Sequence, residues 1–137
     1  MSTLSVASIN SLSSAPPVFK NSSGVEKGQL AKVWCNFNGT GTVAIRSSFN
    51  VSSITDNGTG QYTVNFATAM GNDDYCAVGA CKEKTTNAAT SVIFMLGKVT
   101  SDADGYTTTK LRASSAAYVN DNMYDSATVN VSIFGTS

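Results

Sequence analysis

Alternating apolar and polar residues recur along most of the chain from Ala31 onward. In the clearest run, Tyr62, Val64 and Phe66 alternate with polar residues, which predicts a strand with one buried and one solvated face. Such runs follow one another at intervals of about 8–12 residues, a spacing typical of β-sandwiches. The predicted strands are 31–37, a run that begins at Val43, 49–55, 62–66, 75–81, 91–99, 110–118 and 127–134. The pattern therefore predicts an all-β protein, an antiparallel β-sandwich of about seven or eight strands with an extended N-terminal arm.

Gly-rich segments between these runs predict the turns. The segment 56–60 reads DNGTG and gives the strongest local indication of a hairpin, because Asn and Gly both tolerate the positive φ that a tight hairpin requires. The segment 39–41, GTG, predicts a second turn. Short turns between neighbouring strands are what an antiparallel arrangement needs.

The alternation also predicts which side chains face the core. In the first predicted strand Ala31, Val33, Cys35 and Phe37 share one face, and Arg46 in the next run is expected to face outward. The aromatic residues that lie within strand patterns are predicted to be core residues: Trp34, Phe37, Phe49, Tyr62 and Phe66.

Two later runs complete the predicted core. In the last strand Val129, Val131 and Ile133 lie on one face. The run 92–96, VIFML, is apolar on both faces, so we expect either a central strand or a strand that takes part in a subunit contact.

Residues 1–28 differ from the body, which we place at 29–137. Pro16 and Pro17 exclude a helix or a central strand there, and the cluster NSSG at 21–24 predicts a turn. A polar segment with sparse apolar residues does not order itself easily, so we expect an extended arm that docks on a neighbouring copy or on a larger assembly; the alternative is a flexible terminus. The expected anchoring residues of this arm are Leu4, Val6, Ile9, Leu12, Pro16, Pro17, Val18 and Phe19.

Composition narrows the classes of function. Lys and Arg number 9, as do Asp and Glu, so the formal net charge is zero, which argues against a nucleic-acid binder and against a polybasic membrane-surface protein. No apolar run approaches the roughly 20 residues that span a bilayer. The first residues also lack the basic and continuous apolar regions of a secretory signal, so we expect no export.

Candidate catalytic and metal-binding groups are few. The chain has no histidine, which excludes a Ser–His or Cys–His pair and any His-ligated metal. Cys35, Cys76 and Cys81 are expected to be free thiols, with Cys76 and Cys81 on opposite faces of one strand. Asp102 and Asp104 resemble a fragment of a calcium loop, but the remaining ligands of such a loop are missing, so a turn is the favoured interpretation. We therefore predict a protein that is not an enzyme and carries no cofactor.

Tyrosines in polar loops are the candidate recognition residues. Exposed Tyr beside Ser, Thr and Asn is typical of a recognition surface, because Tyr offers contact area at low entropic cost. The same residues could instead form the rim of a subunit contact. The loop residues concerned are Tyr106, Tyr118, Asn120, Asp121 and Tyr124.

Several longer stretches of the sequence are similar to stretches of a known protein family. The stretch 34–46 reads WCNFNGTGTVAIR, 49–60 reads FNVSSITDNGTG, and 62–66 reads YTVNF; the opening residues, the linker 18–24 and the ending 129–134 contribute as well. Together they resemble a domain that recurs in virion structural and tail-fibre-like proteins of marine tailed phages, notably cyanophages. Residues 71–126 vary among such proteins. Members with long shafts carry them before this domain, whereas here only a short arm precedes it, so a full-length fibre is not expected.

The resemblance implies a non-enzymatic virion component that is made in the host cytoplasm. The leading expectation is a surface decoration or auxiliary protein, which the arm attaches to a capsid or tail protein. The alternative is the receptor-binding tip of a tail fibre or other appendage, in which the loops 82–90, 100–109 and 118–126 bind a host surface glycan or protein. A homo-oligomer is expected in either case, and many such assemblies are trimers.

Overall fold

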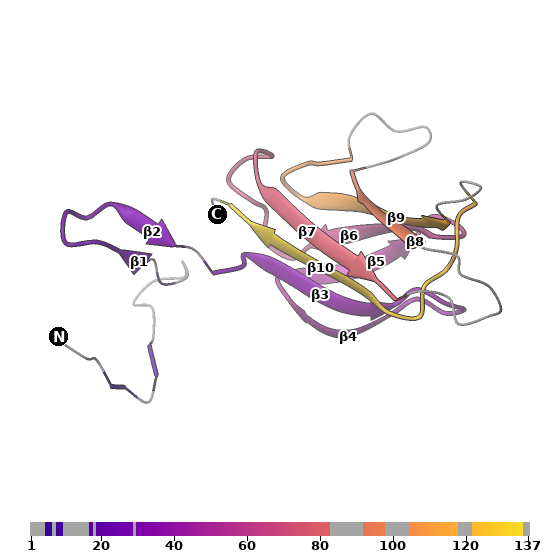
Figure 1. Ribbon diagram of the computed structural model, residues 1–137, viewed down its shortest axis with the longest axis horizontal. Coiled ribbons are helices and arrows are strands. Elements are labelled where there is room, and N and C mark those ends of the chain that lie inside the picture. Colours follow the sequence, from indigo (N-terminus) through magenta and orange to yellow (C-terminus); the bar gives the residue numbers. More distant parts are fainter. Residues whose placement is uncertain are drawn as a thin grey trace. The chain divides into compact units, whose positions relative to one another are not determined.

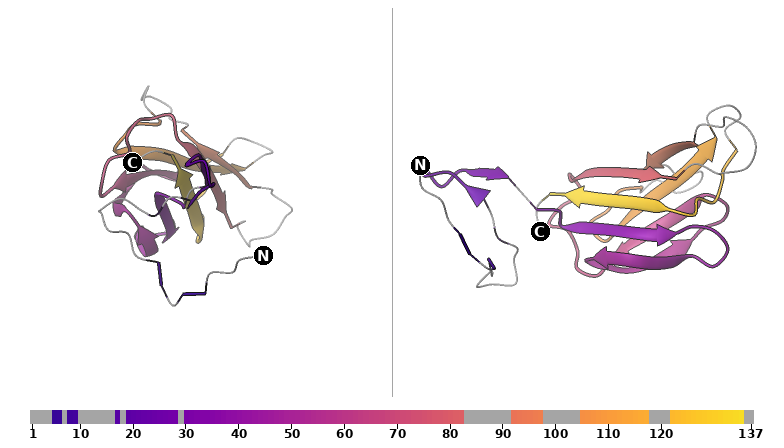
Figure 2. Two further views of the ribbon diagram at one scale, coloured as in Figure 1. Left: turned by 90° about the vertical axis from the view of Figure 1, so that its left-hand side faces the viewer. Right: turned by 60° about the horizontal axis from the view of Figure 1, so that its bottom comes forward.

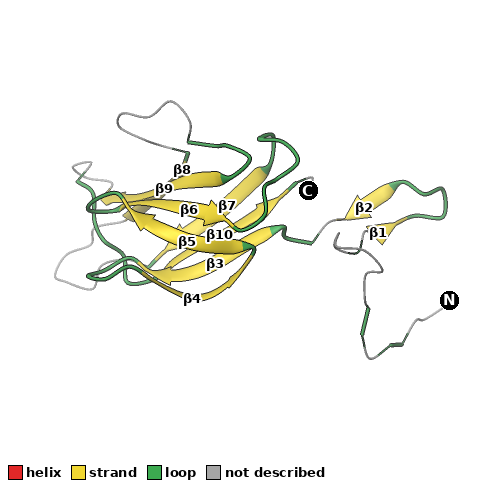
Figure 3. Ribbon diagram, turned by 180° about the vertical axis from the view of Figure 1, so that it is seen from behind, coloured by secondary structure: helices red, strands yellow, loops and turns green. Residues whose placement is uncertain are grey.

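We analysed a computed structural model, which describes residues 5–6, 8–9, 17, 19–28, 30–82, 92–97, 105–117 and 122–135. The chain divides into two compact units, Met1–Leu30 and Ala31–Ser137, so the first unit ends at Leu30 where the sequence placed the end of the arm at residue 28. All regular elements of the described residues are strands (Figure 3).

The first unit contains a short antiparallel hairpin of β1, Phe19–Lys20, and β2, Glu26–Gly28 (Figure 1). Its turn is the predicted one: the Asn21 side chain accepts hydrogen bonds from the backbone N–H of Ser23 and Val25, and Gly24 takes a φ of 76°. This part of the arm is therefore folded back on itself and is not extended throughout. Leu4, Leu12, Pro16 and Val18 lie outside the described residues.

The body is a β-sandwich, as predicted. Its strands are β3 Val33–Asn38, β4 Ala44–Phe49, β5 Val51–Asp56, β6 Gln61–Phe66, β7 Cys76–Cys81, β8 Val92–Leu96, β9 Lys110–Ala117 and β10 Val129–Phe134. They form two four-stranded sheets in the orders β4-β3-β10-β7 and β5-β6-β9-β8, and every neighbouring pair is antiparallel (Figure 1). The described strands thus match the predicted number.

The chain passes from one sheet to the other at Asn50, the one residue between β4 and β5. Asn50 has a φ of 55°, which reverses the direction of the backbone there. Its side chain holds the segment after β6: the Thr68 N–H donates to Asn50 Oδ1 over 2.7 Å, and Asn50 Nδ2 donates to the Thr68 carbonyl over 3.1 Å. Asn suits this position because it tolerates positive φ and offers both a donor and an acceptor.

Two substitutions of Asn50 separate its backbone conformation from its side-chain hydrogen bonds to Thr68. We expect Asn50→Ala to destabilise the body by about 2 kcal/mol, since it adds backbone strain and loses both hydrogen bonds. Asn50→Gly keeps the φ at no steric cost and loses only the bonds, so about half of that loss is expected. Urea unfolding of both variants measures the difference; equal losses would show that the backbone conformation contributes nothing.

The core lies between the two sheets and follows the predicted alternation. Phe37, Tyr62 and Phe66 are buried, and the rings of Phe37 and Tyr62 meet edge to face with centroids 5.1 Å apart. The other buried apolar residues of this cluster are Val33, Cys35, Val64, Met70, Tyr75, Leu111, Val129, Val131 and Ile133. The prediction was wrong for Trp34 and Phe49, which point away from this core.

One end of the sandwich is held by polar contacts around Tyr62. The Tyr62 hydroxyl lies 3.0 Å from the Gly39 carbonyl and 3.3 Å from Asp125 Oδ1, two acceptors that share its proton. Burial, and secondly the charge of Asp125, raises the pKa of Tyr62, so this hydroxyl remains a donor. The hydrogen bonds of the Tyr62 hydroxyl to Gly39 and Asp125 thus connect the turn between β3 and β4 with the segment after β9.

Gly60 lies in the same cluster and is confined by backbone on two sides. Its N–H donates to Asp125 Oδ1 over 2.7 Å, and its carbonyl accepts from the Ser115 N–H over 2.8 Å. Gly60 has a φ of +66°, and a Cβ built on it would lie 2.5 Å from the Ser115 carbonyl oxygen and 2.7 Å from the Tyr124 nitrogen. Only glycine fits here, because neither neighbour can rotate away.

Candidate functional site: the outer face of one sheet

The sheet β4-β3-β10-β7 turns one face to the core and the other away from it. Since Val33, Cys35 and Phe37 of β3 are buried, Trp34 and Asn36 must point outward. The strand register places Phe49 of β4 and Ser132 of β10 beside Trp34, and Val78 of β7 beside Ser132. The row Phe49–Trp34–Ser132–Val78 therefore crosses the whole sheet on its outward side, which we call the outer face.

Large apolar side chains are exposed on this outer face. The exposed fraction is 36% for Trp34, 48% for Phe49, 51% for Val78 and 36% for Phe134. Single exposed apolar residues are ordinary, but a group of them on one sheet face is typical of an interaction surface.

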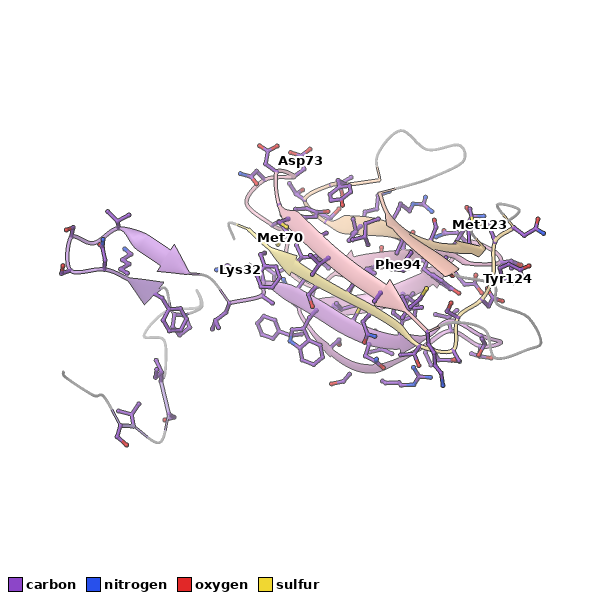
Figure 4. The ribbon with its side chains drawn as sticks, viewed as in Figure 1. Lys32, Met70, Asp73, Phe94, Met123 and Tyr124 are labelled. Atoms are coloured by element: carbon purple, nitrogen blue, oxygen red, sulfur yellow. The ribbon has the colours of Figure 1, made fainter. Side chains whose placement is uncertain are left out.

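A shallow hollow of about 300 Å³ lies over β7 and β10 on the same face. Figure 2, in its right-hand view, shows these two strands and β3 side by side. The hollow lies beside the small outward side chains of Ala80 and Ser132. Gly79 adds no space on this face, because a Cβ built on it would point to the inner side and meet the ring of Phe94 from β8, which Figure 4 labels. The residues that line the hollow are Val78, Gly79, Ala80, Asn130, Val131 and Ser132.

The polar groups of the outer face bind one another. Asn36 Nδ2 donates to Asn130 Oδ1 over 2.6 Å. Arg46, which faces outward as predicted, donates to the Phe37 carbonyl over 3.1 Å, to Asn36 Oδ1 over 3.4 Å and to the Ala127 carbonyl. Its guanidinium is therefore held against the face by uncharged internal acceptors, which satisfy several of its N–H donors but do not neutralise its charge.

The predicted recognition residues are not gathered at this face. Tyr106 is half-buried, with its ring 5.3 Å from that of Tyr75 and packed on Gly97, and burial raises its pKa. Tyr124 is also half-buried, and its N–H donates to the Ser115 carbonyl over 3.0 Å. The exposure expected for these two tyrosines was thus wrong. Tyr118, Asn120 and Asp121 lie outside the described residues.

The run 92–96 forms β8 at the edge of its sheet and is not a central strand. Its described side chains, Phe94 and Leu96, are half-buried and pack against the core. They offer no large exposed surface for a second subunit.

The cysteines are free thiols, and two of them lie on opposite faces as predicted: Cys76 is exposed and Cys81 is half-buried. Burial raises the pKa of Cys35 to about 12, which keeps that thiol protonated and unreactive at neutral pH. No group of three potential Cys, Asp, Glu or His metal ligands occurs in the part of the chain that the structure describes, and Asp102 and Asp104 lie outside it.

Sequence analysis missed the outer face because it placed Trp34 and Phe49 in the core on hydrophobicity alone. The alternation of Val33, Cys35 and Phe37 already puts Trp34 on the opposite side of β3, and this pattern could have revealed its exposure. Chemically, the face offers exposed apolar side chains, a shallow hollow and amide groups, which are suited to binding.

The chain matches no protein-family model, and neither a curated protein nor a solved structure is significantly similar to it. Over the described ranges, no helix has the length and apolar character needed to cross a membrane.

Proposed function

We propose that this chain is a non-catalytic structural protein of a tailed-phage virion, a decoration or auxiliary protein that displays its β-sandwich on the particle. The N-terminal unit attaches it to a neighbouring capsid or tail protein. The sequence resemblance supports the phage assignment, and the exposed apolar residues of the first unit support the attachment.

The observation that carries the proposal is the exposure of apolar side chains in the first unit. The exposed fraction is 52% for Val6 and 61% for Ile9. Phe19, Val25 and Leu30 are exposed as well. A partner that covered these side chains would supply the apolar burial that the unit itself does not, at about 25 cal/mol per Å². Such gains add up over many copies on one particle.

Charged substitutions in the first unit test the attachment. We expect the double variant Val6→Asp, Ile9→Asp to lower the number of copies per purified particle at least about tenfold, because a partner pocket would have to bury two carboxylates. Quantitative mass spectrometry of the particles gives the copy number.

The matched control places the same charges on neighbouring exposed serines, Ser5→Asp and Ser8→Asp. We expect this control to be incorporated normally. Equal copy numbers for the two double variants would refute attachment through Val6 and Ile9. Hundreds of copies in the unmodified particle fit decoration, whereas a few to some tens fit a tail appendage.

Adhesion by a tail-fibre tip is the alternative function, and it has less support. Of its expected recognition residues, Tyr106 and Tyr124 are half-buried and make internal contacts. Binding of the full chain to a defined glycan on an array would favour adhesion over decoration.

A further inference from the structure

We propose that the outer face of the sheet β4-β3-β10-β7 is a two-fold interface between two copies of this chain. The inference concerns the body alone and does not depend on the attachment proposed above. It rests on the shape, the charge and the size of the outer face.

The shape of the outer face is self-complementary. Its β4–β3 half carries two large aromatic side chains, Phe49 and Trp34, and its β10–β7 half carries the hollow of about 300 Å³. A two-fold axis parallel to the strands, between β3 and β10, brings each half of one copy opposite the other half of the second copy. In a two-fold contact each residue pair occurs twice, so the aromatic side chains of both copies are accommodated at once.

The strand register specifies the pairs. In the row Phe49–Trp34–Ser132–Val78, the two-fold axis sets Phe49 opposite the Val78 of the second copy and Trp34 opposite its Ser132. Within this row large side chains thus meet smaller ones; Phe134, two residues beyond Ser132 on β10, lies outside the row.

The charge of the face permits two identical copies to meet. The four strands, which the structure describes throughout, contain a single charged residue, Arg46. The Arg46 guanidinium is bound by the carbonyls of Phe37 and Ala127 and by Asn36. The two-fold axis sets β4, which carries Arg46, opposite β7 of the second copy, which has no charged residue, so like charges do not oppose each other. Depletion of charge is what the cores of protein interfaces share.

The size of the face sets the expected affinity. Each of its strands is six residues long. At about 3.3 Å per residue and about 4.8 Å between strands, the sheet measures roughly 20 Å by 19 Å. At roughly 380 Å² per copy the face lies below the standard size of specific interfaces, so we expect a weak, transient dimer with a dissociation constant of roughly 100 micromolar.

Sedimentation of the full chain over a range of concentrations tests the proposal. We expect a reversible change from the 14.2 kDa chain to a species of twice that mass. Val78→Lys puts a charge at the hollow and should raise the dissociation constant at least about thirtyfold, the scale of an interface hot spot. The control Ser53→Lys, on exposed β5 of the other sheet, should leave it unchanged. A chain that stays monomeric to millimolar concentration, or an assembly insensitive to Val78→Lys, would overturn the proposal.

A charge exchange tests the two-fold register itself. Phe49→Glu and Val78→Lys should each abolish self-association, because each copy then presents its charge to an apolar residue of an identical copy. In an equimolar mixture the new carboxylate faces the new ammonium group, and the second Phe49–Val78 contact remains intact, so a heterodimer is expected. Both positions are exposed, and circular dichroism verifies that each variant is folded. A mixture that remains monomeric would refute this register.

Discussion

The substitution Gly60→Ala is expected to destabilise the body by about 3 kcal/mol. Gly60 has a φ of +66°, a conformation that costs a non-glycine residue about 1 kcal/mol. A methyl group there would also lie 2.5 Å from the Ser115 carbonyl oxygen and 2.7 Å from the Tyr124 nitrogen. Because both are backbone atoms, relief requires that β9 or the segment after it move, which adds the cost of overpacking. The midpoint of urea unfolding measures the loss.

Gly41 provides the matched control. Its φ is +60°, almost that of Gly60, but a Cβ there would meet nothing within 4 Å. Gly41→Ala should therefore cost about 1 kcal/mol, the strain of the backbone alone. Equal losses for the two variants would mean that the segment after β9 does not pack on Gly60. In that case the contacts of Asp125 and Tyr124 at this end of the sandwich would be wrong.

The strands of the body could be predicted because alternation is a local property of the sequence. The predicted run 62–66 became β6, Gln61–Phe66, and 110–118 became β9, Lys110–Ala117. The run 91–99 was predicted too long, since β8 ends at Leu96, before Gly97 with its φ of +77°. Apolar content alone does not show where the backbone turns.

The surroundings of the loop tyrosines could not be predicted, because they depend on contacts between distant parts of the chain. Tyr106 packs on Gly97 and on Tyr75, which lies 31 positions earlier in the chain. The absence of a side chain at Gly97 makes room for that ring, and nothing near Tyr106 in the sequence indicates it. Polar neighbours thus suggested exposure, whereas the tertiary contacts produce burial.

For Trp34, in contrast, the sequence itself indicates that the side chain is exposed. Hydrophobicity suggested burial of Trp34, while the period-two pattern of its own strand placed it outside. The position of Phe49 beside it required the register between β3 and β4, which shifts between Asn36 and Phe37. The outer face of this sheet therefore follows from local alternation together with a pairing that the sequence does not reveal.

Truncation of two aromatic residues on β3 tests this inside–outside assignment. Phe37→Ala should destabilise the body by about 3–5 kcal/mol, because it leaves a cavity beside Tyr62 in the core. Trp34→Ala removes a larger side chain, but one that is exposed by 36% and leaves no enclosed cavity, so a smaller loss of about 2 kcal/mol is expected. Urea unfolding below the concentration at which copies associate gives both values.

Substitutions at Trp34 and Phe37 should rank in the opposite order for self-association. Trp34→Ala removes one of the two aromatic side chains that the second copy accommodates, so it should weaken the dimer while the fold persists. The conservative variant Phe37→Leu keeps most of the core volume and should leave association unchanged, because Phe37 faces the core. If Trp34→Ala unfolded the body as strongly as Phe37→Ala, Trp34 would be a core residue, and an outer face built around it could not exist.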